Sequence, residues 1–390
     1  MKERYKLTIE PLTPVHIGTG VELTPLDYKV TSKLGTTDFK KNMYFKFSSD
    51  KILKRMIESG DTQKLAKFEE ASVKGNMKEL QSFFQQNLTS VEDLDYPCEV
   101  TNGFVKRYSE NQGKDPYDNA SKVYQMYRPE GLKTPVIPGS SLKGSIRTAV
   151  LNSILYDISD EKYNELKDEF NNVKDPKTFE TKLQKALLGS YSDAKNDPFR
   201  AVQIGDCSFP AKNSQLVGEL YNVSLNQKNN NIEPIGIQII AEAIKGNLMD
   251  SSEKAETILL LDSDLLKTNQ ITKKISAEEI AKSCNHFFKT QFDNEFEKFY
   301  ELCESINCSK LDELDKLISN IVNANDNSFI IRVGRWSQVE FVTFGSDFRT
   351  PKTPKGKDGK PKGWGGTRTL FDYNGQYLPM GWCKCTISKL

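Results

Sequence analysis

The sequence predicts an α+β fold made of two tandem ferredoxin-like domains with helical insertions. Three observations indicate this. A chain of 390 residues is long enough for two domains. Alternating apolar and polar residues mark short strands, and charge-rich segments with helical spacing are inserted between them. This series of strands, helices and strands occurs twice, so we place the N-terminal domain at 1–200 and the C-terminal domain at 201–390.

The N-terminal half begins with a half-buried strand at 5–10, because apolar and polar residues alternate there. The loop at 11–20 follows, with two prolines that stop strand pairing and two glycines that allow a tight turn. Helical sequence, capped by Ser49 and Asp50, continues to about residue 88. Further strands are expected at 27–30, 44–47, 100–108 and 122–128.

In the rest of the chain a helix is expected to start near Ser141, and another to run from Asp175 to Gly189. The C-terminal domain carries a helical insert at 277–324 and a basic loop at 349–368. This loop contains five lysines, one aspartate and Trp364, which suits contact with a nucleic-acid backbone and stacking on a base. A solvated linker is the alternative. Strands are expected at 201–206, 216–225, 235–241 and 329–333.

Composition narrows the possible functions. The net charge is only +1, so a nucleic-acid site would have to be a local basic patch. Seven cysteines without a C-x-x-C pair, and only two histidines, argue against a structural zinc site. We therefore expect no metal and no cofactor. The odd, scattered cysteines suit reduced thiols in a cytoplasm, and no apolar run is long enough for a membrane span.

Residues 134–150 are the most informative segment. An extended stretch ends at Pro138, a Gly-Ser-Ser turn follows, and Lys143 and Arg147 lie four residues apart on one helical face. Free N–H groups at a helix start form an anion site, which suits a phosphate. A P-loop is excluded because Lys143 precedes the second glycine, Gly144. A simple helix start with surface cations stays open as the alternative.

Several segments together resemble the RAMP superfamily of CRISPR-associated RNA-binding proteins. More narrowly, they resemble the Csm-type subunit that caps the guide-RNA (crRNA) 3′ end in type III-A effector complexes. These segments span nearly the whole chain: 12–20, 137–149, 199–206, 332–337 and 378–382.

The resemblance implies tandem RRM-like domains in a non-catalytic subunit that binds crRNA and supports its maturation. It also implies contact with a backbone RAMP subunit and with a small helical subunit of the same complex, and recruitment of a 3′-trimming nuclease. We expect RNA contacts at His16, Gly139, Ser140, Ser141, Lys143, Arg147, Arg335, Trp336, Lys362, Trp364 and Arg368.

The rival hypothesis is an endoribonuclease. Asp27 lies where backbone RAMP subunits of such complexes carry an aspartate that cuts target RNA, and a carboxylate with Mg²⁺ near a 2′-hydroxyl could support cleavage. The Gly-Gly-x-Asp context of those nucleases is absent around Asp27. His16 is a second catalytic candidate, as a general base without an obvious partner.

Overall fold

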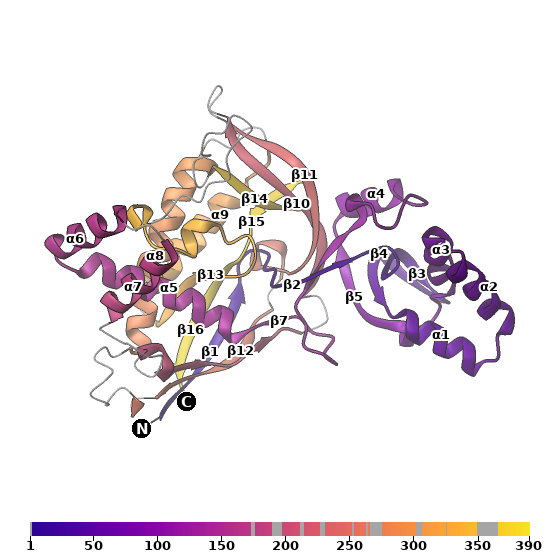
Figure 1. The fold of residues 1–390 in the computed structure, drawn as a ribbon, viewed down its shortest axis with the longest axis horizontal. Helices are drawn as coiled ribbons and strands as arrows, with labels where there is room; N and C mark the ends of the chain where they lie inside the picture. The colour runs from indigo at the N-terminus through magenta and orange to yellow at the C-terminus, as the bar shows by residue number, and fades with distance from the viewer. Residues whose placement is uncertain are drawn as a thin grey trace.

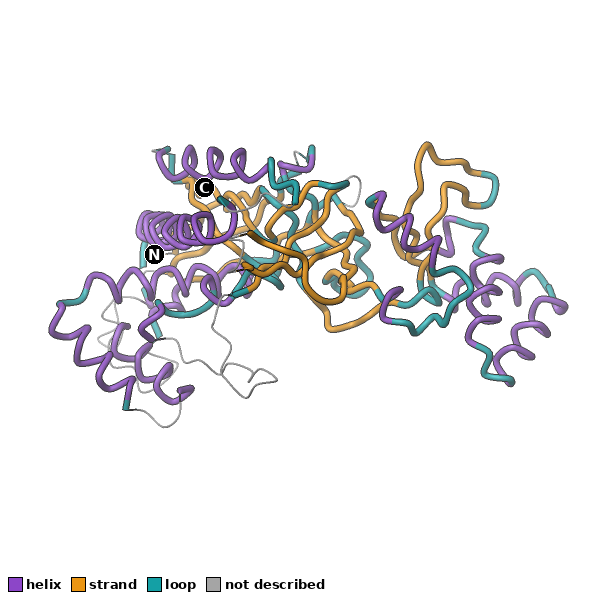
Figure 2. The backbone as a smooth tube through the Cα atoms, turned by 90° about the horizontal axis from the view of Figure 1, so that it is seen from above, coloured by secondary structure: helices purple, strands orange, loops and turns teal. Residues whose placement is uncertain are grey.

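The computed structural model describes residues 2–172, 176–188, 197–210, 214–226, 231–251, 253–262, 264–265, 275–301, 306–324, 326–348 and 366–390. Helices and strands are mixed along the chain, which confirms the α+β class. Figures 1 and 2 show a large body, which contains both ends of the chain, and a smaller lobe beside it.

The central sheet of the large body has five antiparallel strands. Its middle strand is β1 (Lys2–Pro11), which pairs with β12 (Ala255–Asp262) on one side and β16 (Trp382–Lys389) on the other. The edges are β8 (Val202–Ile204) and β13 (Ser328–Arg332). The two predicted halves of the chain, 1–200 and 201–390, therefore share this sheet.

Helices α5 (Gly139–Asp157) and α8 (Ala277–Glu295) pack against each other beside this sheet (Figure 1). In chain order β1, α5, β8, β12, α8 and β16 form one βαββαβ series, in which the strands are neighbours in the order β8–β12–β1–β16. One ferredoxin-like unit is therefore recognisable, with large insertions between its elements. The tandem arrangement stays a prediction.

A second, nine-stranded sheet runs from the large body into the lobe (Figure 1). The middle of this sheet is the long antiparallel hairpin of β10 (Gln215–Asn226) and β11 (Asn231–Ile244). The other strands are β2 (Gly18–Leu23), β3 (Tyr28–Leu34), β4 (Thr37–Phe47), β5 (Leu94–Val100), β6 (Val123–Met126), β14 (Thr367–Tyr373) and β15 (Gln376–Pro379). A short pair, β7 (Val136–Ile137) and β9 (Cys207–Ser208), lies apart.

The lobe places three helices against β3 and β4: α1 (Ser49–Glu58), α2 (Thr62–Val73) and α3 (Met77–Asn87). They close over their own core, which includes Phe45, Phe47, Ile52, Phe83 and Phe84.

One strand prediction is wrong. Residues 102–108 belong to α4 (Asn102–Glu110), not to a strand. Thr101 caps this helix by accepting a hydrogen bond from the Phe104 N–H at 3.3 Å. Phe104 and Tyr108, four residues apart, are both buried. Aromatic residues favour strands, but here their spacing matches a helix face.

The helical insert expected at 277–324 contains α8 and α9 (Lys310–Asn323), with a π-helical turn at Phe296–Tyr300 after α8. Two more helices, α6 (Asp160–Asn171) and α7 (Pro176–Leu188), extend the large body. Five cysteines are free and buried, whereas Cys308 is disulfide-bonded, so not all seven thiols are reduced as expected. Within the described ranges, no helix is long and apolar enough to cross a membrane.

Candidate nucleic-acid interface

A groove of about 450 Å³ lies in the large body where three distant segments of the chain meet. One wall is the loop after β1, the second is the first half of α5, and the third is the loop after β13. All three contain motifs singled out in the sequence. The lining of this central groove includes Gly18, Ser141, Gly144, Thr148, Arg332 and Arg335.

The loop after β1 is held by backbone hydrogen bonds to the C-terminal segments. The Arg335 N–H donates to the His16 carbonyl at 2.8 Å, and the Gly381 N–H donates to the Pro14 carbonyl at 2.8 Å. Gly334 has φ +90°, and a Cβ there would lie 2.4 Å from the His16 carbonyl oxygen. Only glycine permits this approach, which explains why the 332–337 motif has glycine at this position.

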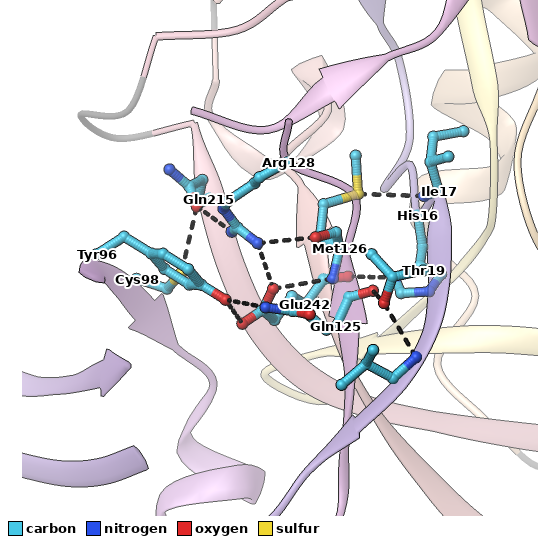
Figure 3. Close-up of polar contacts among 11 residues, drawn as sticks. His16, Ile17, Thr19, Tyr96, Cys98, Gln125, Met126, Arg128, Gln215 and Glu242 are labelled. Carbon is cyan, nitrogen blue, oxygen red and sulfur yellow. Dashed lines mark hydrogen bonds and ion pairs between the residues drawn. The ribbon is translucent and has the colours of Figure 1, made fainter. Parts of the chain in front are cut away.

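A buried carboxylate, Glu242, organises the residues next to this loop (Figure 3). It accepts hydrogen bonds from the Tyr96 hydroxyl at 2.9 Å, the Met126 N–H at 2.9 Å and Arg128 at 2.6 Å. The Arg128 guanidinium also lies 3.7 Å from the centre of the Tyr96 ring. Loss of these hydrogen bonds would leave a buried charge without a partner, which is strongly destabilising. The network therefore fixes the local geometry.

His16 connects this network to the groove. Its Nδ1 donates to the Glu242 backbone carbonyl at 2.7 Å, and its ring centroid lies 4.9 Å from that of Trp336. Burial lowers the pKa of His16 to about 4, so the imidazole is neutral at pH 7. The side chain is fully buried, which corrects the expectation that it touches RNA directly. Its role as a general base stays a prediction, and we assign it the positioning of Trp336.

Arg335 is the exposed cation of the groove. Its guanidinium lies 4.3 Å from the Tyr124 ring centre and 4.9 Å from that of Trp336. With the residues that the structure describes it forms no ion pair, so its charge is available to a ligand. Tyr124, from β6, was not among the predicted site residues, because nothing in a single sequence pairs it with a loop two hundred residues away.

The backbone that presents Arg335 is strained. Trp336 and Gln338 both have φ +67°, in a region that side chains other than glycine rarely adopt. Such a conformation costs about 1–3 kcal/mol per residue and is found preferentially at functional sites. Together with Gly334, these residues set the loop conformation in which the Arg335 guanidinium lies against both aromatic rings.

The start of α5 differs from the open anion site predicted for it. The Gly139 N–H already donates to the Asp206 carboxylate at 2.8 Å, and the N–H groups of Ser141 and Leu142 both donate to the Pro138 carbonyl. Gly139 itself is buried, and a Cβ there would lie 2.0 Å from the Ile204 carbonyl oxygen. Gly139 is therefore a packing residue, while Ser140 is exposed and Ser141 lines the groove.

The two cations of this motif have different environments. The Arg147 guanidinium pairs with Asp197 at 2.8 Å, bonds to Gln184 and lies 4.9 Å from the Phe199 ring centre. Its charge is therefore neutralised inside the protein, which corrects its expected role as a phosphate ligand. Lys143 is half-buried, and this desolvation lowers its pKa. It forms no ion pair within the described ranges, so it remains a candidate phosphate contact.

A sequence profile of the RAMP superfamily matches residues 8–362. The chain belongs to the RAMP superfamily. The matched range contains the segments 12–20, 137–149, 199–206 and 332–337, which had suggested this family. No curated protein sequence matches the chain.

Two solved structures have a fold similar to that of this RAMP protein. One is a chain in a cryo-EM structure of a Csm–crRNA–target RNA ternary complex of a type III-A CRISPR–Cas system, with a TM-score of 0.63, 17% identity and 100% of both chains covered. The other is the crystal structure of T. onnurineus Csm5, with a TM-score of 0.59, 17% identity, and 96% of this chain and 99% of that chain covered. The similarity therefore extends over the full length of the fold.

The basic-loop predictions for the RAMP protein have mixed outcomes. Lys362 and Trp364 lie outside the described residues. Arg368 is 2% exposed and forms ion pairs with Glu295 at 2.5 Å and Glu340 at 3.3 Å. Glu295 also binds Arg332 at 2.8 Å, so Arg368 belongs to a buried charge cluster behind the groove wall. This corrects its expected role as an RNA contact.

Asp27 of the RAMP protein lies in the turn directly before β3. Its carboxylate accepts hydrogen bonds from the Thr24 N–H at 2.9 Å and from the Thr24 hydroxyl at 3.0 Å. These bonds close the turn, which gives Asp27 a structural role. In the described part of the chain, no three or more acidic, histidine or cysteine side chains cluster where they could hold a metal ion.

Proposed function

We propose that this RAMP protein is an RNA-binding subunit of a type III-A CRISPR (Csm) complex that caps the 3′ end of the crRNA, supports its maturation and does not itself cut RNA. The observation that carries the proposal is Arg335, an exposed guanidinium without an ion-pair partner among the described residues, which lies against two aromatic rings at the edge of the groove.

The chemistry of the groove suits an RNA backbone. Arg335 supplies a cation and a flat face on which a base can stack, and hydroxyls of Ser141 and Thr148 lie in the lining. Lys143, one residue from the groove-lining Gly144, adds a second positive charge. Few of these groups can read base edges, so we expect contacts with phosphates and 2′-hydroxyls to dominate over sequence readout.

Family membership and the two similar structures support the choice of complex. In this role, the partners are crRNA, one neighbouring backbone RAMP subunit, a small helical subunit and a recruited 3′-trimming nuclease, assembled in the cytoplasm. A capping subunit at the end of a row of backbone RAMP subunits contacts only one of them, so it joins each complex once.

The groove is tested by replacing Arg335 with alanine in the full chain. Loss of a stacked or phosphate-bound guanidinium should weaken binding of single-stranded RNA about tenfold or more, and should flatten the log–log salt dependence by about one unit. Filter binding at several salt concentrations measures both. Arg4→Ala, which removes an exposed arginine from the first strand, is the matched control and should change neither.

An Arg335→Ala protein with wild-type affinity and salt slope would contradict the groove assignment. The capping role has its own readout, because complexes reconstituted with this variant should contain crRNA with altered 3′ ends. The nuclease alternative is tested by incubating the protein with Mg²⁺ or Mn²⁺ and labelled RNA. Cleavage that disappears in Asp27→Ala would favour the enzyme.

A further inference from the structure

The lobe contains a polar pocket of about 300 Å³ that lies well away from the groove. It is formed by β3, α3 and the turn after α4. Its lining consists of two lysines, four glutamines, a serine and a glycine, and contains no acidic residue. Carboxylates neutralise most lysines elsewhere in the lobe, for example Lys46 and Lys51, which both pair with Asp95. An anion is therefore the kind of ligand that this amide pocket favours.

Lys29 lies partly buried in the amide pocket. Desolvation lowers its pKa, and no carboxylate forms an ion pair with it in the described ranges. One of its three N–H donors binds the Gln85 carbonyl at 2.7 Å in the last turn of α3. That bond ties β3 to α3 and leaves two donors for a ligand. Lys78, on the first turn of the same helix, is exposed and likewise forms no ion pair there.

Gln81 is the second, independent sign of a ligand. It is only 8% exposed and lines the pocket, yet its side-chain amide forms no hydrogen bond with the described residues. Its amide atoms are not among the fully buried polar atoms that lack a partner, so water reaches them from the pocket and a ligand can replace that water. The neighbouring Gln85 differs, because its amide donates to the carbonyls of Pro25 and Tyr28 and serves the fold.

We propose that the amide pocket binds a nucleotide, with its phosphate on Lys29 and Lys78 and its base edge on the glutamine amides. A pocket of this volume is at the small end of ligand sites and suits one nucleotide better than a protein segment. A glutamine amide has both donors and an acceptor, the pattern that pairs with adenine. The nucleotide can come from a free mononucleotide or from one position of an RNA strand. The pocket is separate from the groove, so the inference does not depend on the proposed function.

Calorimetric titration of the full chain tests this with three probes: AMP, inorganic phosphate and a short adenine-containing RNA. AMP should bind more tightly than phosphate. Lys78→Gln should weaken both about tenfold, because it removes one charge-assisted contact. Gln81→Leu should weaken AMP about tenfold and leave phosphate unchanged. The RNA arm uses Arg335→Ala protein, so that the groove does not mask the pocket, and it shows whether the nucleotide is free or part of a strand.

Lys67→Gln is the matched control, because it removes an exposed positive charge from α2 in the same lobe. The proposal is overturned if AMP does not bind, or if the control weakens AMP as much as Lys78→Gln does. It is also overturned if a folded Gln81→Leu protein binds AMP as the wild type does. Circular dichroism checks that fold, and exposed Lys78 provides a test that does not depend on a buried substitution.

Discussion

His16 makes the unfolding free energy of the chain depend on pH. Its pKa is about 4 in the folded chain, because burial disfavours the charged imidazole, compared with the ordinary value of 6.5. Between these two pH values the unfolded chain binds a proton that the folded chain does not. The stabilisation from neutral His16 is therefore fully present above pH 6.5 and is lost as the pH falls toward 4.

We expect this one group to remove about 3 kcal/mol of unfolding free energy between pH 7 and pH 4. His16→Asn is the comparison, because its amide can still donate to the Glu242 carbonyl but does not titrate in this range. Urea unfolding at a series of pH values should give a shallower pH dependence for the variant. Parallel profiles for the two proteins would show that folding does not lower the pKa of His16.

At the residue scale, the sequence predicted the segments of the site better than the role of each side chain. The motifs around His16, Ser141 and Arg335 line one groove, as expected of a single site. What a single sequence does not contain is the partner of each charge. Arg147 and Asp197 are fifty residues apart, so only the folded chain shows that this cation is already neutralised.

At the scale of the element, two glycines in the first turns of α5 have opposite surroundings. A Cβ on Gly139 would lie 2.0 Å from the Ile204 carbonyl oxygen, whereas a Cβ on Gly144 would meet nothing within 4 Å. Gly139 lets the helix start pack against the end of β8. Gly144 lines the open groove and has no such packing reason to be glycine.

We therefore expect Gly139→Ala to destabilise the protein by about 1–3 kcal/mol through overpacking. Gly144→Ala should instead stabilise it by up to about 1 kcal/mol, because alanine is the better helix former. The added methyl group in the groove should nevertheless weaken RNA binding. Thermal unfolding and filter binding, measured on both variants, check these opposite effects. A Gly144→Ala protein that binds RNA as the wild type does would place RNA outside the groove.

Elements with a clear hydrophobic period were predictable. The alternation at 5–10 became β1, and the helix expected near Ser141 became α5, starting two residues earlier. The segment at 100–108 was misassigned because its aromatic residues favour strands, while the cap at Thr101 and the burial of Phe104 on the second sheet favoured a helix. Short aromatic segments are ambiguous until their neighbours are known.

At the scale of the whole molecule, the central sheet joins the two ends of the chain. β1 is its middle strand, and both of its neighbours, β12 and β16, come from beyond residue 250. The register pairs Leu7 with Thr257 on one side and Ile387 on the other. The boundary at 200/201 was inferred from the order of elements along the chain. That order does not show which strands pair, because strand pairing depends on contacts between distant residues.

This arrangement predicts that the fragment 1–200 does not fold cooperatively alone. Without β12 and β16, β1 would expose unpaired N–H and C=O groups on both edges, and the buried faces of Leu7 and Ile9 would lose their cover. Thermal unfolding followed by circular dichroism should show no sharp transition for the fragment, in contrast to the full chain. Co-expression with 201–390 is the control, because the second fragment supplies both neighbours of β1 and should restore a cooperative transition. A sharp transition in 1–200 alone would mean that the N-terminal half is an independent domain, and that the sheet observed here forms only after two preformed halves dock.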